Sequence, residues 1–368
     1  MSDKKKRGSG AIDYWLFTIV FILCCIGLIM VLSASQYSAA YEFGDSYYYL
    51  KRQFFNIAVG LVAMLVAVNV DYRIYGRLSW PIFWFGFGLM LLVLFSGLGD
   101  SGGGSQRWIQ LGSIRFQPSD VMKLSMLVLL CKQLAQPQGM FVGNPLAYLL
   151  VAGISCGIVA INDLGTGIVM GITVWLLFAI GGIKMRYLLG LIALGIAGVS
   201  AMIIQKPYRL RRLTGFLDPW ADYYGDGYQV VQSLLAIGSG GLMGVGLGEG
   251  GAKWFYLPER HTDFIYAILV EEGGFIGGTL LLLLFFAFTW RGLTIALRVE
   301  DMFGRLLATG LTLMITVQAL VNIAIALGMM PVTGITLPFI SYGGTSLVIS
   351  LASVGVLLNI SRFAKRNK

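Results

Sequence analysis

The feature that most constrains this chain is a repeated pattern of long apolar blocks separated by short polar segments. Each block is roughly 17 to 24 residues long, enough for a helix rising 1.5 Å per residue to cross the hydrocarbon core of a bilayer. Only 12% of the 368 residues are charged and 57% are hydrophobic, so a soluble fold would lack polar surface to cover its core. The pattern predicts an all-α polytopic membrane protein.

We expect about ten transmembrane helices in a single domain over residues 1–368, because no stretch is left that is large and polar enough for a soluble domain. The expected spans cover residues 14–32, 54–70, 79–97, 119–135, 145–161, 165–181, 187–204, 264–287, 306–327 and 342–360.

The basic residues predict the orientation. Lys and Arg gather in short segments between the expected spans, and such basic segments usually lie in the cytoplasm. The basic tails 1–13 and 361–368 are therefore both expected in the cytoplasm. The longer connections then lie outside, at 33–53, at 98–118 and above all in the extracellular loop 205–263 between spans seven and eight. Long connections without evident secondary structure usually serve a site. The formal charge of +9 is scattered between the blocks, which favours contact with anionic lipid over nucleic acid.

Ionisable residues at or inside a span are functional candidates, because each costs a few kcal/mol to insert. Asp263 ends the long outer loop directly before an apolar helix. Two interpretations stay open. The carboxylate could cap the helix, where free backbone N–H groups stabilise an anion. It could instead be a general base at the outer membrane surface, with a pKa raised by partial desolvation and a sugar hydroxyl approaching from the loop.

Three further candidates lie near the starts of spans four and six. Asp120 and Lys123 are three residues apart, so on a helix they share one face and can pair. Lys123 could equally join Arg107 in neutralising a phosphate group at the interface. Asp163 lies in a very short turn, either as a helix cap or as an inward-facing carboxylate that orients a lysine or a metal.

The residues 238–251 form a glycine-rich segment that invites comparison with phosphate-binding loops. It has neither the spacing nor the lysine of a P-loop, and no strand precedes it. We expect a flexible or re-entrant loop.

Several motifs together resemble the SEDS family of bacterial membrane proteins (shape, elongation, division and sporulation), from the first span to the last. The motifs are Arg107-Trp108-Ile109, Phe116-Gln117-Pro118-Ser119-Asp120 with Lys123, Asp163-Leu164-Gly165-Thr166-Gly167, Gly227-Tyr228-Gln229, Leu257 to Phe264, and Pro331 to Gly344. Residues 211–220 and 246–248 resemble the FtsW and SpoVE branch more than RodA. Two departures are Asp120, where the family usually has glutamate, and Gly273-Gly274, where Leu-Gly is common.

The resemblance implies a peptidoglycan glycosyltransferase of the bacterial cytoplasmic membrane. Such an enzyme polymerises lipid II, an undecaprenyl-pyrophosphate disaccharide-pentapeptide, on the outer face, with a class B penicillin-binding protein as partner. Its essential aspartate corresponds to Asp263, the base of an inverting transfer in which undecaprenyl pyrophosphate leaves. No soluble cofactor is implied, and a divalent cation, Mg²⁺ or Mn²⁺, is an alternative source of positive charge. The expected substrate-binding residues are Lys123, Arg107, Asp120, Asp163, Arg211 and Arg212.

Two other classes of function stay open. A ten-span protein could flip lipid II across the bilayer, with Asp163, Lys123 and Glu272 as inward-facing groups. Transporters often consist of two related halves, and the sequence has no clear internal repeat. A third hypothesis makes the protein a non-catalytic scaffold for the transpeptidase.

Overall fold

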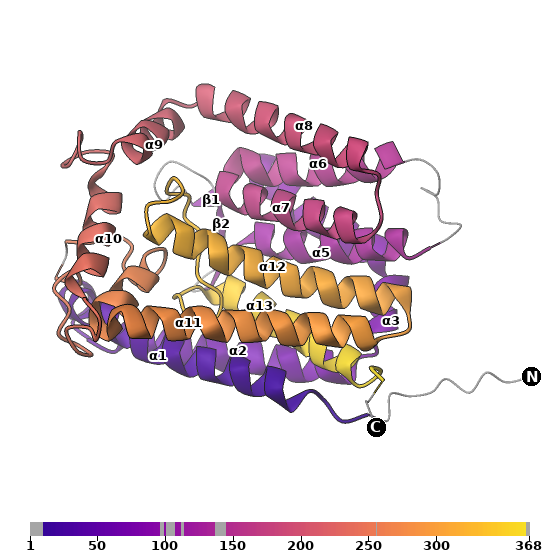
Figure 1. Ribbon diagram of the computed structural model, residues 1–368, viewed down its shortest axis with the longest axis horizontal. Helices are drawn as coiled ribbons and strands as arrows, with labels where there is room; N and C mark the ends of the chain where they lie inside the picture. The colour runs from indigo at the N-terminus through magenta and orange to yellow at the C-terminus, as the bar shows by residue number, and fades with distance from the viewer. Residues whose placement is uncertain are drawn as a thin grey trace, which may run out of the picture.

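The computed structural model describes residues 10–95, 99–100, 107–111, 114–136, 145–254 and 256–365. Most of its long helices run nearly parallel to one another and form one bundle (Figure 1). The helices that correspond to the expected spans are α1 (Tyr14–Phe43), α2 (Tyr48–Asn69), α4 (Ser79–Phe95), α5 (Pro118–Leu134), α6 (Pro145–Asn162), α7 (Leu164–Ile180), α8 (Met185–Ile204), α11 (Ile265–Arg298), α12 (Met302–Ala326) and α13 (Gly344–Ser361).

The predicted polytopic helical fold is confirmed, since every expected span coincides with one of these helices. Six of them are long and apolar enough to cross a membrane, namely α1, α2, α8, α11, α12 and α13. The helices α4, α6 and α7 are shorter but apolar. Outward-facing apolar side chains on helices such as α8, which is scarcely buried inside the bundle, fit a lipid environment.

The start of α1 and the end of α13 meet at one end of the bundle (Figure 1). The backbone N–H of Asp13 donates to the Ser361 hydroxyl at 3.0 Å, which joins the two ends directly. An even number of crossings requires this arrangement, so it agrees with the expectation that both termini share one side. The tail residues 1–9 and 366–368 lie outside the described residues.

The predicted outer loop 33–53 was wrong for most of its length. Helix α1 continues to Phe43 and ends on Gly44, which takes the left-handed conformation at φ 67°. The serines in this stretch read as polar, but the Ser35 hydroxyl donates back to the Val31 carbonyl at 2.6 Å, so a buried helix satisfies it. Small side chains such as Ala34 then pack tightly in the core.

The long outer segment 205–263 also contains helices, contrary to expectation. They are α9 (Pro207–Leu217) and α10 (Tyr228–Ser239). Proline suits the first turn of α9, because a missing N–H costs nothing there. Helix α10 buries Val230, Val231 and Ala236 and packs on α11 and α12. A short helix α3 (Tyr72–Arg77) joins α2 and α4.

The connection 98–118 holds a small antiparallel sheet that the all-α prediction missed. Its strands are β1 (Gly99–Asp100), β2 (Trp108–Leu111) and β3 (Ile114–Phe116), in the order β1-β2-β3. Ile109 pairs with Phe116 in the β2–β3 ladder, and Arg107 lies near Pro118 and Ser119 in the first turn of α5.

Helix α11 is broken at Gly274, whose φ of 67° and ψ of −172° lie outside the helical region. The break frees the carbonyls of Glu271 and Glu272, and the glycine-rich segment satisfies them. Val245 N–H donates to the Glu271 carbonyl at 3.0 Å and Gly246 N–H to that of Glu272 at 3.2 Å. The segment is therefore a loop built into the break of a transmembrane helix, where every backbone group needs a partner.

Candidate active site

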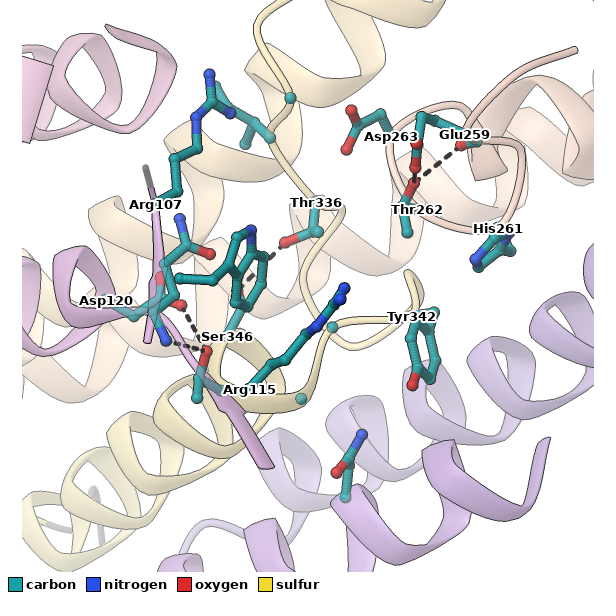
Figure 2. A pocket seen from close by; sticks show the side chains of 18 of the residues that line it. Arg107, Arg115, Asp120, Glu259, His261, Thr262, Asp263, Thr336, Tyr342 and Ser346 are labelled. Atoms are coloured by element: carbon teal, nitrogen blue, oxygen red, sulfur yellow. Dashed lines mark hydrogen bonds between the residues drawn. The ribbon is translucent and has the colours of Figure 1, made fainter. Parts of the chain in front are cut away.

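A cavity of about 1850 Å³ opens at the end of the bundle opposite the chain ends. It is enclosed by the ends of α1 and α2, the strands β2 and β3, the first turns of α5, helix α9, the turn 257–264 and the connection 331–343. Figure 2 shows its acidic, basic and aromatic side chains projecting from these separate elements into one space. Most of the sequence-predicted site residues line it, although they are far apart in the chain.

Asp263 lies on a tight turn that precedes α11. The Glu259 carbonyl accepts the N–H groups of Thr262, Asp263 and Phe264 at 3.2, 3.1 and 3.2 Å, and Glu259 itself has a left-handed φ of 50°. The Thr262 hydroxyl donates to the Glu259 carboxylate at 2.7 Å, as Figure 2 shows. These hydrogen bonds within the turn hold its backbone in one conformation.

The helix-cap interpretation of Asp263 was wrong. Phe264 occupies the cap position of α11, and no side chain caps that end. The Asp263 carboxylate is partly buried and lines the cavity, yet it accepts no hydrogen bond from the residues that the structure describes. Buried polar groups are normally paired, so an acid left open in a cavity is available to something that binds there.

Burial raises the pKa of Asp263 from its ordinary value to about 7, and the negative charge of Glu259 adds to the effect. Arg107 and Arg212 oppose the shift because they stabilise the carboxylate, whereas Asp163 raises the pKa further. A general base is most effective when its pKa lies near the working pH. The environment of Asp263 therefore suits proton abstraction at neutral pH.

Arg107 faces Asp263 across Gly334. A Cβ atom at Gly334 would lie 2.7 Å from Arg107 Nη1 and 3.6 Å from Asp263 Oδ2, and the φ of 80° there also favours glycine. Arg107 is held by donating to the carbonyls of Asn162 at 3.2 Å and Thr333 at 3.4 Å. Figure 2 shows Arg107 and Asp263 on either side of the segment that leads to Thr336.

Asp163 is a helix cap, as one of the two interpretations predicted. Its carboxylate accepts the Thr166 N–H at 3.1 Å and the Thr166 hydroxyl at 2.8 Å. It also accepts the side-chain amide of Gln117 at 3.0 Å and lies 3.7 Å from Arg107 Nη1. The side chain is only 2% exposed and does not line the cavity. Asp163 therefore acts on the site through its contacts with Arg107 and Gln117 and through its charge, without lining the cavity.

Asp120 and Lys123 form the expected ion pair at 3.2 Å. Both are buried, and both line the cavity. Lys123 also donates to the Gln318 side chain at 2.7 Å, and Thr345 donates to Asp120 at 3.4 Å. Asp120 thus makes a direct contact with Lys123 despite being a methylene shorter than glutamate.

The two arginines of α9 take different positions. Arg212 lines the cavity and donates to the Val332 carbonyl at 3.4 Å. The structure does not bring Arg211 to the cavity, because its side chain is 68% exposed and lies 3.8 Å from Asp226. Consecutive residues on a helix point about 100° apart. Sequence reasoning that expected no helix here had no basis for separating them.

Sequence reasoning missed other residues of the cavity, among them Arg52, Glu259 and Gln318. Gln318 and the nearby Asn322 are four apart in an apolar span, which places both on one face of α12. Polar residues at that spacing inside a membrane helix were the signal that could have identified them.

His261 is half-buried between the rings of Tyr49 and Tyr342, at centroid distances of 4.5 and 5.7 Å. Burial lowers the pKa of His261 to about 4, so the imidazole is neutral at physiological pH. Within the described part of the chain, no group of three or more His, Cys, Asp or Glu side chains is placed to hold a metal ion. The positive charge in the cavity comes from arginine and lysine side chains.

A family model described as "Cell cycle protein" and named for FtsW, RodA and SpoVE matches residues 14–366. The chain belongs to the FtsW/RodA/SpoVE family. It is 44% identical to "Stage V sporulation protein E" of Bacillus subtilis (strain 168), over 96% of this chain and 98% of that protein. It is 42% identical to "Probable peptidoglycan glycosyltransferase FtsW" of Geobacter sp. (strain M18), over 95% and 96%.

Solved structures of FtsW/RodA/SpoVE proteins share the fold. A chain of the structure described as "Structural coordination of polymerization and crosslinking by a peptidoglycan synthase complex" superposes with a TM-score of 0.78 at 32% identity, covering 96% of this chain and 98% of that one. The rod shape determining protein RodA of Thermus thermophilus superposes with a TM-score of 0.72 at 28% identity, covering 97% and 99%. The family assignment therefore rests on sequence and structure over nearly the whole chain.

Proposed function

We propose that this protein is a peptidoglycan glycosyltransferase that polymerises lipid II, with Asp263 as the general base. The observation that carries the proposal is an acid without a hydrogen-bond donor among the described residues, with a pKa of about 7, in a large cavity lined by arginines. The names of the relatives agree, since several FtsW proteins with 37 to 42% identity are called probable peptidoglycan glycosyltransferases.

In the proposed reaction the 4-hydroxyl oxygen of the acceptor's terminal GlcNAc attacks the anomeric carbon of the donor's MurNAc. Its proton passes to Asp263 as the new carbon–oxygen bond forms. The bond from the anomeric carbon to the diphosphate oxygen breaks, and undecaprenyl pyrophosphate leaves. Attack opposite the leaving group inverts the configuration. Asp263 then returns its proton to solvent before the next cycle.

The departing diphosphate gains negative charge, which cations in a partly dehydrated cavity stabilise strongly. Arg212 is the best placed, because it lines the cavity and its described polar contacts are a backbone carbonyl at 3.4 Å and the ring of Tyr208. Lys123 would divide its positive charge between the diphosphate and Asp120, and Arg107 would divide its charge between the diphosphate and the Asp263 carboxylate. A divalent cation carried by the diphosphate is the alternative source of charge.

We place the protein in the bacterial cytoplasmic membrane with the cavity facing outward. The cavity and the chain ends lie at opposite ends of the bundle, so if the basic tails are cytoplasmic, as the positive-inside rule favours, Asp263 faces outside. The partner we propose is a class B penicillin-binding protein, a transpeptidase that would cross-link the new strands. The structural relative from a peptidoglycan synthase complex that couples polymerization and crosslinking supports this partnership.

The contacts in the bundle argue against lipid transport. Of the inward-facing groups that a flippase would use, Glu272 is bonded to Lys253 and Ser33, Asp163 caps α7, and Lys123 is paired with Asp120. A non-catalytic scaffold would not need an open acid in a cavity. The glycosyltransferase accounts for Asp263, and the other two functions do not.

The test is polymerisation of labelled lipid II by the purified protein with its transpeptidase partner, with glycan strands resolved on a gel. Asp263→Ala should lose about 100- to 10,000-fold in rate, the usual contribution of a general base. Glu249→Gln is the matched control, because this exposed acid lies outside the cavity. Equal polymer from Asp263→Ala and wild type would remove Asp263 from the mechanism, and lipid movement in vesicles without polymer would favour transport.

A further inference from the structure

Asn322 of α12 makes two hydrogen bonds that join separate walls of the cavity. Its side-chain amide donates to the backbone carbonyl of Asp263 at 2.8 Å and to that of Ile335 at 2.6 Å. The side chain is fully buried in a membrane-spanning helix. Both N–H bonds of the amide are committed to these two acceptors, whereas its carbonyl oxygen has no partner among the described residues.

The Asp263 carbonyl depends on this contact. The N–H of Ala267, which an ideal first turn of α11 would direct at Asp263, instead donates to the Phe264 carbonyl at 3.0 Å. A buried carbonyl without a donor is unfavourable, so the amide of Asn322 fixes the orientation of this peptide group. The Cα and the carboxylate of the proposed base move with that peptide.

The second acceptor, Ile335, follows Gly334, the residue across which Asp263 and Arg107 face each other. Asn322 thus holds both sides of the gap between the base and the arginine. Two other contacts join the same walls, from Tyr342 N–H to the His261 carbonyl at 2.9 Å and from the Ser341 hydroxyl to the Thr262 carbonyl. The Ser341 contact holds the peptide group before the Asp263 Cα, and the Asn322 contact holds the peptide group after it.

We propose that Asn322 is a positioning residue for glycosyl transfer, which sets the distance of the Asp263 carboxylate from Arg107 and from the acceptor hydroxyl. This inference rests on the proposed function, because it assumes that Asp263 is the base. A misplacement of about 1 Å in a reacting group can cost about 100-fold in rate. The loss should appear in kcat, since Asn322 is outside the cavity lining and binds no substrate.

The pH dependence of the rate gives a second readout, because the pKa of Asp263 depends on its burial and on the charges that face it. Glu259 and Asp163 contribute negative charge, and Arg107 and Arg212 contribute positive charge. Burial is the main reason that the pKa of Asp263 is high, and a turn released from Asn322 admits water. The pKa of Asp263 should then fall, and the acidic limb of the pH–rate profile should move to lower pH.

Asn359 of α13 is a matched control at the other end of the bundle. Its amide donates to the Val68 carbonyl at 2.7 Å, and its oxygen accepts the Tyr72 N–H at 2.9 Å. It is buried and makes two backbone contacts like Asn322, but it lies outside the cavity. A purely structural loss should therefore be similar at both positions.

The experiment compares Asn322→Leu with Asn359→Leu in the complex with the transpeptidase, using labelled lipid II. For Asn322→Leu we expect kcat to fall about 100-fold, KM to stay within about threefold, and the acidic limb to shift to lower pH. Asn359→Leu should lose comparable thermal stability, with kcat within about threefold and an unmoved limb. Asn322→Gln keeps both donors on a longer arm and should recover part of kcat.

The positioning role is overturned if Asn322→Leu keeps the wild-type pH profile and loses no more kcat than Asn359→Leu. If Asn322→Leu does not fold, Asn322→Ser, which is smaller and keeps one donor, is measured against the same criteria. Failure of the proposed function is distinguishable, because Asp263→Asn would then still make polymer. An inactive Asp263→Asn with an unaffected Asn322→Leu would reject the positioning role alone.

Discussion

The acid before the start of α11, Asp263, and the two acids about two turns along it, Glu271 and Glu272, differ in the hydrogen bonds that they accept. Glu271 accepts the N–H groups of Gly251 and Ala252 at 2.7 and 3.1 Å. Glu272 accepts the Ser33 hydroxyl at 2.6 Å and the Lys253 ammonium at 3.1 Å. Asp263 directly precedes Phe264, the cap residue of the same helix, and its carboxylate accepts no hydrogen bond from the described residues.

The difference separates structural acids from a chemical one. An acid surrounded by donors stabilises the fold and has no capacity left for a substrate. The Lys253–Glu272 pair, with Lys253 also donating to the Gly248 carbonyl, anchors the glycine-rich segment to the break in α11. The open carboxylate of Asp263 costs stability, and such costs are retained where they serve function.

Breaking the Lys253–Glu272 ion pair should have the largest effect on stability. Lys253→Met leaves Glu272 buried without its cation, which should lower the free energy of unfolding by about 3 to 5 kcal/mol. The double variant Lys253→Met with Glu272→Gln should recover most of the loss, because no uncompensated charge remains. Thermal unfolding in detergent measures both. Equal stability of the single and double variants would show that the pair is not the anchor.

Replacing Arg107 should have a smaller effect, on the pKa of Asp263 and on the rate. Arg107 lowers the pKa of Asp263, so Arg107→Gln should raise this pKa and move the acidic limb of the rate profile to higher pH. The rate at pH 7 should fall about tenfold, since fewer molecules carry the ionised base and one diphosphate contact is lost. The direction is opposite to that expected for Asn322→Leu. A limb that stays in place in Arg107→Gln would mean that the two groups do not interact.

Much of the bundle could be predicted because apolar length is a local property of the sequence. Asp263 could be found in the same way, since it directly precedes an apolar helix. The continuation of α1 through its serines could not, because their hydroxyls are satisfied only once the helix exists. The position of Arg211 depends on the phase of α9, and the contact between Asn322 and Asp263 joins residues 59 positions apart. These features depend on packing, which no single stretch of sequence contains.

The most direct test of the account is kcat/KM for lipid II polymerisation as a function of pH, because this ratio reports the free enzyme's essential base. A carboxylate with a pKa of about 7 must lose its proton to act, so the rate should rise with pH, level off above about 7, and have no such limb in the residual activity of Asp263→Asn. A wild-type limb near 4, or the same limb in Asp263→Asn, would contradict the claim that the open acid of the cavity is the base.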